Sequence, residues 1–157
     1  MSEGEIKRIE AILKKYHIDY EKSKHEAVFT SEQAARIRGV SLKQGVKSII
    51  LRTDEGKFID ALVPANLRVD TKKLANLIGT KCLKFASPEE VLEETGCEVG
   101  AVPPFGILWD IPVYMDKKIL ENRKVDFNAG LHTVSIKMKS SDLKKVLDPI
   151  MCDISKE

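Results

Sequence analysis

The sequence has few cysteines, and their spacing gives them no common task. Cys82, Cys97 and Cys152 are far apart and form no CxxC pair. An odd number of scattered cysteines argues against a disulfide framework and against a zinc site. We therefore expect three separate thiols in a reducing compartment, with no bound metal and no other cofactor.

Long apolar runs and an excess of one charge are also absent. No stretch approaches the ~20 apolar residues that span a bilayer, and residues 1–16 are charged throughout without an apolar signal core. These absences predict a cytoplasmic protein with no membrane partner. The 26 basic and 24 acidic residues leave a formal charge of +2. Because a nucleic-acid coat normally needs a stronger basic excess, any RNA contact should come from a local patch.

The composition that is present is typical of a folded domain. The chain has 157 residues, of which 43% are hydrophobic and 32% are charged. That is enough apolar material for a packed core with a well-solvated surface, and disorder is excluded on the same grounds. The length favours a single domain over residues 1–157.

Apolar periodicity and capping residues predict an α/β (α+β) domain. Helices are expected over residues 4–17, from a cap at Thr30 to Gly39, from Asp70 to Gly79, from Ser87 to Gly96, and near residues 141–148. Strands are expected before His25 and over residues 46–51, 58–63, 82–85, 111–115 and 132–138. The strands expected over residues 46–51 and 58–63 form a hairpin around a turn at residues 54–56. The predicted architecture is a mixed, largely antiparallel sheet or partial barrel with helices packed on it.

Lys47 is the first residue that could carry chemistry. It stands in QGVKSIIL, at the start of a strand whose following residues look buried. One interpretation is an edge lysine whose ammonium group reaches solvent. The other is a cation at the mouth of a pocket, where several donors on a flexible stem hold a carbonyl or phosphate oxygen.

The segment GAVPPFG, residues 100–106, is the second candidate. Its two prolines stiffen the chain, while its glycines let the backbone approach a ligand closely. Exposed N–H groups in a rigid turn can hold an oxyanion or fix an ester carbonyl. The alternative is a structural turn between two regular elements.

Asn128 and Gly130 form the third candidate, a predicted tight turn ahead of the last long strand. Asn and Gly favour the left-handed conformation that such turns need. His132 lies just beyond, and a lone histidine is more often structural than catalytic, although its pKa suits a base. We find no Ser/His/Asp order, no paired carboxylates and no metal spacing.

These three segments, in this order, resemble the YbaK/ProX family, which includes the editing domain inserted in many bacterial prolyl-tRNA synthetases. The resemblance covers nearly the whole chain. Its motifs are QGVKS (44–48), VPA (63–65), DTKKL (70–74), TG (95–96), GAVPPFG (100–106), IPV (111–113) with Asp116, and NAG (128–130).

The resemblance implies a trans-editing aminoacyl-tRNA deacylase, which hydrolyses the ester of a mischarged tRNA such as Cys-tRNA(Pro) or Ala-tRNA(Pro). Lys47 matches the family's essential lysine, and Gly100 and Pro104 match its GxxxP loop. The chain departs from some alanine-editing members, which have FHP at positions 127–129, and from cysteine-editing members, which carry Asp near Ser135. The implied partners are the aminoacylated 3′ end of tRNA and a prolyl-tRNA synthetase.

We accordingly predict catalytic roles for Lys47 and for the backbone of Gly100. Because a lysine is a poor base unless it is desolvated, we expect Lys47 to orient the amino acid or the terminal ribose. Water, a ribose hydroxyl or a substrate thiol would attack the activated ester. Apolar walls would exclude larger amino acids, although one missing methylene is worth only ~1–3 kcal/mol. The predicted substrate-binding residues are Phe29, Ser48, Pro104, Phe105, Asn128 and Gly130.

Two other interpretations remain open at this point. The same pocket could belong to a non-catalytic module that binds an aminoacyl end or a small metabolite, or to a regulatory domain with a vestigial pocket. The joint presence of Lys47 and the Gly100 loop favours the enzyme. A deacylation assay on a panel of mischarged tRNAs separates the three.

Overall fold

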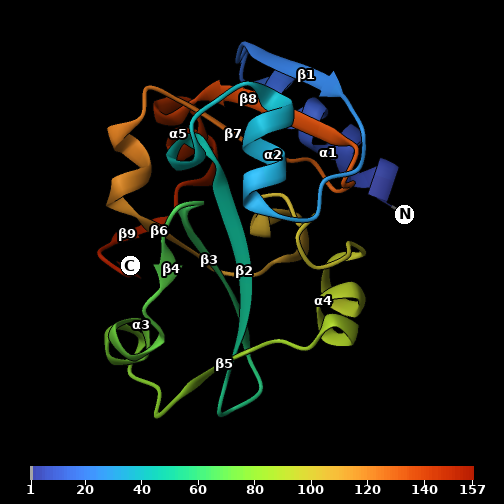
Figure 1. Cartoon of the computed structure of the whole chain (residues 1–157). Coiled ribbons are helices and arrows are strands. Elements are labelled where there is room, and N and C mark those ends of the chain that lie inside the picture. The colour runs from blue at the N-terminus through green and yellow to red at the C-terminus, as the bar shows by residue number, and fades with distance from the viewer. Residues whose placement is uncertain (1) are drawn as a thin grey trace.

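The computed structural model describes residues 2–157 and combines helices with three small sheets (Figure 1). The α-helices of this part are α1 (Ser2–Lys15), α2 (Ser31–Arg38), α3 (Thr71–Ile78), α4 (Pro88–Thr95) and α5 (Ser140–Leu147). Three 3-10 helices accompany them: η1 (Leu42–Gln44), η2 (Gly106–Trp109) and η3 (Lys117–Glu121). The strands are β1 (Tyr20–Lys24), β2 (Val46–Thr53), β3 (Phe58–Pro64), β4 (Arg68–Val69), β5 (Leu83–Phe85), β6 (Val113–Asp116), β7 (Lys124–Asn128), β8 (Val134–Lys139), β9 (Ile150–Cys152) and β10 (Ser155–Lys156).

The strands form one five-stranded, one three-stranded and one two-stranded sheet. Their orders are β5-β2-β3-β6-β9, β1-β8-β7 and β10-β4. The β2–β3 hairpin is antiparallel, as are β2–β5 and all pairs in the two smaller sheets, whereas β3–β6 and β6–β9 are parallel. The sheets remain open and do not close into a barrel. The predicted mixed, largely antiparallel α+β fold is confirmed.

Local capping explains why the short helices begin where the sequence predicts. Thr30 accepts a hydrogen bond from the backbone N–H of Gln33 at 3.0 Å, and Ser87 accepts one from Glu90 at 3.1 Å. In both helices the side chain of the third residue, Gln33 or Glu90, also accepts a hydrogen bond from the backbone N–H of the cap residue. Such reciprocal caps satisfy two N–H groups that the helix itself leaves unpaired. These boundaries were therefore predictable from local sequence.

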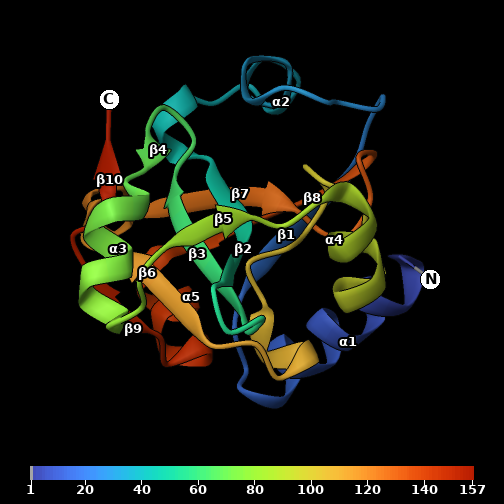
Figure 2. The ribbon, with the colours of Figure 1, turned by 90° about the horizontal axis from the view of Figure 1, so that it is seen from below.

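The main core lies between α1 and the sheet of β7 and β8. Ile9 and Leu13 of α1 are fully buried there, as the helical spacing predicts. The helix ends at Lys15, earlier than expected, because His17 adopts a left-handed φ of 55°. Tyr16 is consequently 50% exposed rather than packed. Two smaller clusters fill the spaces beneath α3 and α4, which lie on opposite sides of β2 in both views (Figures 1 and 2).

Strand β7 corrects the sequence analysis. The sequence analysis predicts no strand directly before the turn at Asn128, yet residues 124–128 form one that pairs with β8 along its whole length. Charged Lys124 and Asp126 alternate with buried Val125 and Phe127, which is the period of a strand with one apolar face. Asn128 is the last residue of β7. The short strands β4, β9 and β10 were also not predicted.

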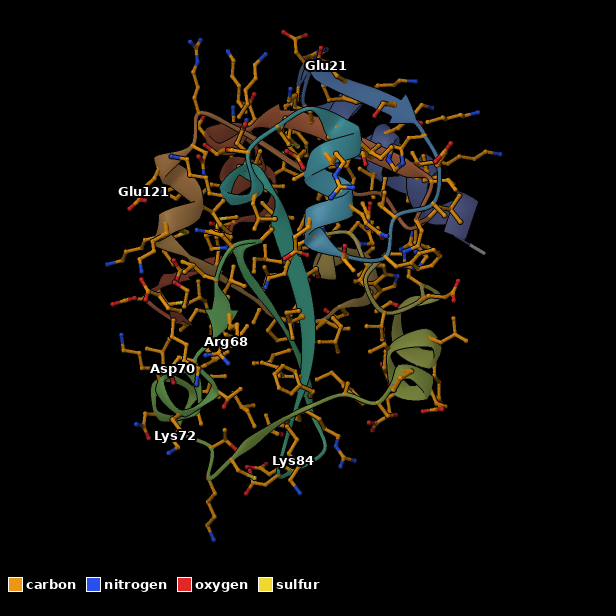
Figure 3. The ribbon with its side chains drawn as sticks, in the orientation of Figure 1. Glu21, Arg68, Asp70, Lys72, Lys84 and Glu121 are labelled. Carbon is orange, nitrogen blue, oxygen red and sulfur yellow. The ribbon has the colours of Figure 1, made fainter. Side chains whose placement is uncertain are left out.

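Charged side chains cover the outside of the domain, as its composition suggests. Glu21, Lys84 and Glu121 lie at separate edges and are exposed (Figure 3). The two termini lie on opposite sides of the molecule in both views (Figures 1 and 2). No helix in residues 2–157 is long and apolar enough to cross a membrane.

Candidate active site

A cavity of about 430 Å³ lies between α2, the first half of β2, the β5–α4 connection, the Gly100 loop and β7. It contains five of the residues singled out in the sequence. All of them contribute to its lining: Phe29, Lys47, Ser48, Gly100 and Asn128. The fold therefore brings together segments that are as much as 99 positions apart, as residues 29 and 128 are (128 − 29 = 99).

The open edge of β2 shapes one wall of this cavity. Strand β2 pairs with β3 over residues 46–52 but with β5 only over residues 51–53. The Gly45 carbonyl accepts a bond from Ala65 on the β3 side, and the Ile50 carbonyl accepts one from Ala86 on the β5 side. Since backbone groups alternate along a strand, the N–H and C=O of Ser48 point to the β5 side, where no strand pairs with that residue. A ligand in the cavity can reach these groups.

Lys47 lies on this wall with its side chain half-buried. Its ammonium group makes no hydrogen bond or ion pair with the residues that the structure describes. Burial lowers the pKa of the Lys47 ammonium, and Glu32 opposes this while Arg68 adds to it. An unpaired, partly desolvated ammonium is available for a ligand that presents oxygen atoms.

The Ser48 side chain is held by a buried carboxyl group that the sequence analysis missed. Ser48 Oγ donates to Asp60 Oδ1 at 2.6 Å. Asp60 is fully buried on β3, and burial raises its pKa to about 7, although the bonds from Ser48 and the Gly106 backbone oppose the rise. The sequence feature that could have revealed Asp60 is an acidic residue inside the apolar run FIDALVP.

The Gly100 loop is attached to the end of β7. Gly100 has a φ of +87°, and its carbonyl accepts a hydrogen bond from Asn128 Nδ2 at 2.6 Å. The neighbouring Ala101 carbonyl accepts one from Gly130 N at 2.9 Å. Left-handed backbone is the conformation that favours glycine. The two predicted turn segments are thus one structural unit on the cavity wall.

Three of the predicted substrate-binding residues lie outside the lining of the cavity. Pro104 and Phe105 are buried, and the Phe105 ring packs on Phe127 with centroids 5.8 Å apart. Gly130 is also buried, behind the loop. Apolar side chains in this tight loop fill the core and so anchor Gly100 at the cavity. We therefore leave these three out of the binding set proposed below.

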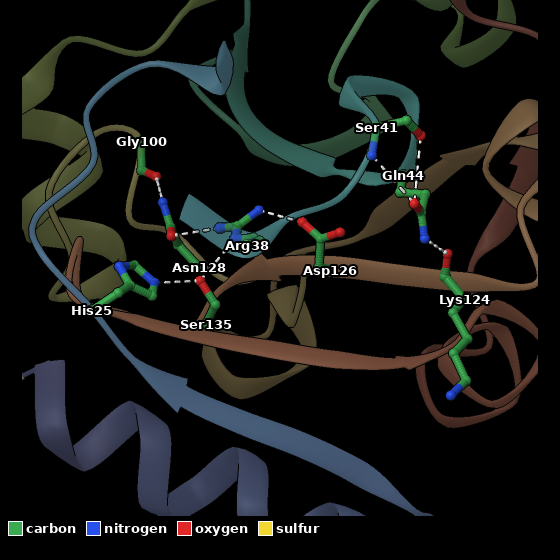
Figure 4. A network of polar contacts seen from close by, with 9 residues as sticks. All are labelled: His25, Arg38, Ser41, Gln44, Gly100, Lys124, Asp126, Asn128 and Ser135. Carbon is green, nitrogen blue, oxygen red and sulfur yellow. Dashed lines mark hydrogen bonds and ion pairs between the residues drawn. The ribbon is translucent and has the colours of Figure 1, made fainter. Parts of the chain in front are cut away.

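A buried arginine joins α2 to the floor of the cavity (Figure 4). Arg38 bonds to one oxygen of Asp126, to Asn128 Oδ1 at 2.7 Å and to Ser135 Oγ at 2.8 Å. His25 Nε2 lies 2.7 Å from the same Ser135 oxygen. Burial raises the pKa of Asp126, and Arg38 opposes that rise. The planar fork of an arginine suits several fixed acceptors at once.

Two aromatic rings stand at the rim of the cavity. Phe29 is 69% exposed and Phe85 is 66% exposed, and both contribute to the lining. The Phe29 ring lies 4.6 Å from the ring of His132, whose Nδ1 is 2.9 Å from the Val28 carbonyl oxygen. His132 supports Phe29 and is not part of the cavity lining. The sequence analysis missed Phe85.

The thiols are not placed for joint chemistry. Cys97 and Cys152 are buried, and burial raises the pKa of each thiol to about 11. Cys82 is exposed, and none of the three lines the cavity. Across residues 2–157, no group of three or more His, Cys, Asp or Glu side chains is arranged to hold a metal ion.

The cavity of this small α+β domain combines an unpaired lysine, an open strand edge and a rigid glycine loop. A site of this class is suited to an activated acyl ester. Comparison with known proteins identifies the family. The profile described as aminoacyl-tRNA editing domain matches residues 25–146. The chain therefore belongs to the aminoacyl-tRNA editing domain family.

Individual relatives agree with this assignment. The multifunctional Ser/Thr-tRNA deacylase ProXp-y of Escherichia coli K12 is 32% identical over 155 residues, covering 95% of this chain and 93% of that protein. The proline–tRNA ligase of Bacillus licheniformis is 36% identical over 90 residues, but these make up only 16% of the ligase. A crystal structure presented as a candidate trans-editing enzyme for prolyl-tRNA synthetase superposes with a TM-score of 0.83 at 26% identity, covering 98% of each chain.

The resemblance to the YbaK/ProX family is confirmed by these findings. The predicted activity of this chain, hydrolysis of the ester bond of an aminoacyl-tRNA, is confirmed with it. The predicted link to tRNA and to the editing domains of prolyl-tRNA synthetases is confirmed in that general form.

Proposed function

We propose that this chain is a free-standing, single-domain editing deacylase that acts in trans on mischarged tRNA in the cytoplasm. Its similarity to ProXp-y over nearly the full length of both proteins supports action as a separate domain. The cavity of about 430 Å³ would hold the amino acid together with part of the terminal ribose, with Arg38 and Asp126 among the residues that line it. A prolyl-tRNA synthetase is the proposed protein partner, and no bound metal takes part.

Lys47 and Gly100 carry the proposed chemistry. The Lys47 ammonium would bind an oxygen of the ester or the terminal ribose, and the backbone beside Gly100 would hold the reacting end of the substrate. The attacking oxygen or sulfur bonds to the carbonyl carbon, the ester C–O bond breaks, and the ribose oxygen leaves with a proton. Because the ester is already activated, positioning and charge stabilisation suffice.

Ser48, Asn128 and the rim aromatics would place the substrate. The open edge at Ser48 offers one N–H and one C=O to the aminoacyl group, and Asn128 fixes the carbonyl of Gly100. Phe29, one of the predicted substrate-binding residues, lies at the rim together with Phe85, and there the terminal base of the tRNA would stack. Stacking of a base on an aromatic ring is worth about 1–3 kcal/mol.

The unpaired Lys47 at the open edge of β2 is the observation that carries this proposal, and its removal is the test. We expect Lys47→Met to lower single-turnover deacylation by about 10²-fold or more, the scale of losing an electrostatic contact to the developing charge. Lys47→Arg should also fail, since a planar fork does not replace a compact ammonium.

Thermal melts of the same variants are the control. Lys47→Met should melt at the wild-type temperature or higher, because it removes an unpaired charge that burial disfavours. Near-wild-type turnover would remove Lys47 from the mechanism. If the wild-type protein binds charged tRNA but deacylates none of a mischarged panel, the non-catalytic binding module is the correct interpretation.

A further inference from the structure

A buried carboxyl group next to the cavity has no cationic partner in the protein. In the described part of the chain, three buried side-chain atoms lack a hydrogen bond: Asp60 Oδ2, Asp126 Oδ2 and Ser155 Oγ. Arg38 balances the charge of Asp126, whereas no ion pair in residues 2–157 involves Asp60. An isolated buried carboxylate is costly, and a positive charge placed near it favours its ionised form.

The charged side chains of the neighbouring elements are engaged elsewhere. On β2, Arg52 pairs with Glu90 at 3.4 Å. On β6, Asp116 accepts hydrogen bonds from two backbone N–H groups that lie outside the cavity. At the start of η2, Gly106 offers Asp60 only its backbone N–H. A cation that compensates Asp60 must therefore come from a ligand.

Ser48 connects this carboxyl group to the cavity. Because Ser48 Oγ donates its only proton to Asp60 Oδ1 at 2.6 Å, the lone pairs of the same oxygen remain able to accept. The residue lines the cavity and is partly exposed. Its backbone C=O points to the side of β2 on which no strand pairs with it. Two acceptors of one residue are thus offered to a donor in the cavity, next to a buried carboxyl group.

The chemistry of these acceptors selects a cation with several donors. Oxygen acceptors supported by a carboxylate suit an ammonium group, which carries three N–H donors and a full charge. In an aminoacyl ester, the α-ammonium group is attached to the carbon next to the ester carbonyl. Side chains alternate along a strand, so Lys47 points to the opposite face of β2 and is left for an oxygen of the ester or ribose.

We propose that Ser48 Oγ and the Ser48 carbonyl bind the α-ammonium group of the aminoacyl ester, with Asp60 supplying the compensating charge through Ser48. Asp60 does not touch the substrate and is a positioning residue. The inference rests on the proposed function and adds to it the chemical class of the substrate, an ester with a free α-amino group. A hydrogen bond to a charged group corresponds to a preference of about 10- to 100-fold over an uncharged analogue.

Binding of non-hydrolysable analogues is the first test. Alanyl and lactyl amides of 3′-amino-3′-deoxyadenosine differ only in the ammonium or hydroxyl group on the α carbon, and the N-acetyl-alanyl amide blocks the ammonium. In calorimetric titrations the wild-type protein should bind the alanyl amide at least about tenfold more tightly than either of the others. Equal affinities for the alanyl and lactyl amides would overturn the inference and leave the deacylase function intact. A clear preference without any deacylation of charged tRNA would instead contradict the proposed hydrolytic function.

The second test changes the two residues. Asp60→Asn keeps an acceptor for Ser48 Oγ but removes the charge, so the alanyl-to-lactyl preference should fall by about tenfold with the lactyl affinity within a few-fold of wild type. Ser48→Ala should lower the preference as well. Asp116→Asn, which changes another buried carboxyl group of the same sheet outside the cavity lining, is the matched control and should keep it. A parallel loss for both analogues with a lower melting temperature would assign Asp60 a structural role only.

Proton release on binding is a measurement that a structural role would not change. Burial places the pKa of Asp60 at about 7, and a bound ammonium group would lower it. At pH 7 the wild-type protein should therefore release up to about half a proton more than Asp60→Asn when it binds the alanyl amide. Titrations in buffers of different ionisation enthalpy measure this difference. Equal proton release by the two proteins would overturn the role of Asp60.

Discussion

At the scale of single residues, Gly100 links backbone conformation to activity. Its φ of +87° is a value that disfavours any side chain, and its carbonyl is fixed by Asn128. A Cβ at this position would meet His132 Cε1 at 3.4 Å, which is an ordinary contact. The structural cost of a substitution should therefore come from the backbone. Any loss of activity beyond this loss of stability must come from the effect of the new side chain on the cavity.

We expect Gly100→Ala to destabilise the fold by about 1–2 kcal/mol, the cost of left-handed backbone for an L-residue, and to lower single-turnover deacylation by about 10²-fold. Gly79→Ala is the matched control, since Gly79 has the same φ of +87°, ends α3 away from the cavity and has open space at its Cβ. It should cost similar stability and leave the rate unchanged. If both variants turn over at the wild-type rate, the loop is only a structural turn.

Asp60 gives a pH-dependent prediction at the same scale. Its pKa is raised from 3.8 to about 7 by burial, so the folded chain holds this proton more tightly than the unfolded chain. The stability that this contributes is complete below pH 3.8 and is lost as the pH rises to about 7, at about 1.4 kcal/mol per pH unit as an upper bound. Relative to Asp60→Asn, the wild-type melting temperature should therefore fall between pH 5 and pH 8. A constant difference over that range would show that Asp60 is ionised in the fold.

At the scale of elements, Arg38 connects α2, β7 and β8. Helix α2 has eight residues and buries only Ala34 among its apolar side chains, so apolar packing alone holds it weakly. The three hydrogen bonds of the Arg38 guanidinium hold the helix in addition to this packing. Through Asn128 they also connect α2 to the Gly100 loop. Removing one partner of a buried ion pair leaves the other charge uncompensated.

We expect Arg38→Lys to lower the free energy of unfolding by about 1–3 kcal/mol, the cost of buried acceptors left without a donor, and to reduce deacylation, since a single ammonium cannot reach three fixed acceptors. Arg36→Lys, an exposed position on the same helix, should change it by less than about 0.5 kcal/mol. Urea denaturation of both variants measures the difference. Equal stabilities would mean that α2 is held by contacts other than this fork.

At the scale of the whole molecule, the cysteines allow a test of whether a protein thiol takes part in the reaction. Cys82 is exposed, whereas Cys97 and Cys152 are buried with pKa values raised to about 11. Iodoacetamide should therefore modify only Cys82 in the native protein, as read by intact mass, and the modified protein should keep its deacylation rate. Each Cys→Ser variant should also remain active. Loss of activity in a folded variant would support a protein thiol in the reaction.

Several features of this protein are determined by the sequence alone. The starts of α2 and α4 follow from Thr30 and Ser87, because a cap acts on backbone groups only three residues away. The β2–β3 hairpin follows from two apolar runs around a short turn. The segments at Lys47 and Gly100 also stand out in the sequence, since both contain residue types that break the surrounding pattern, and both residues line the cavity. Such local signals do not depend on where the rest of the chain lies.

Other features were decided only by the tertiary structure. Nothing near Arg38 in the sequence indicates that it bonds to Asp126 and Ser135, which lie 88 and 97 positions away. The raised pKa of Asp60 and the unpaired oxygen of Asp126 likewise arise from burial among distant segments. Phe105 was expected in the pocket and instead fills the core, because an apolar side chain suits either place and only packing decides between them. Long-range contacts set both burial and hydrogen-bond partners, and these determine what a polar group in the cavity can bind.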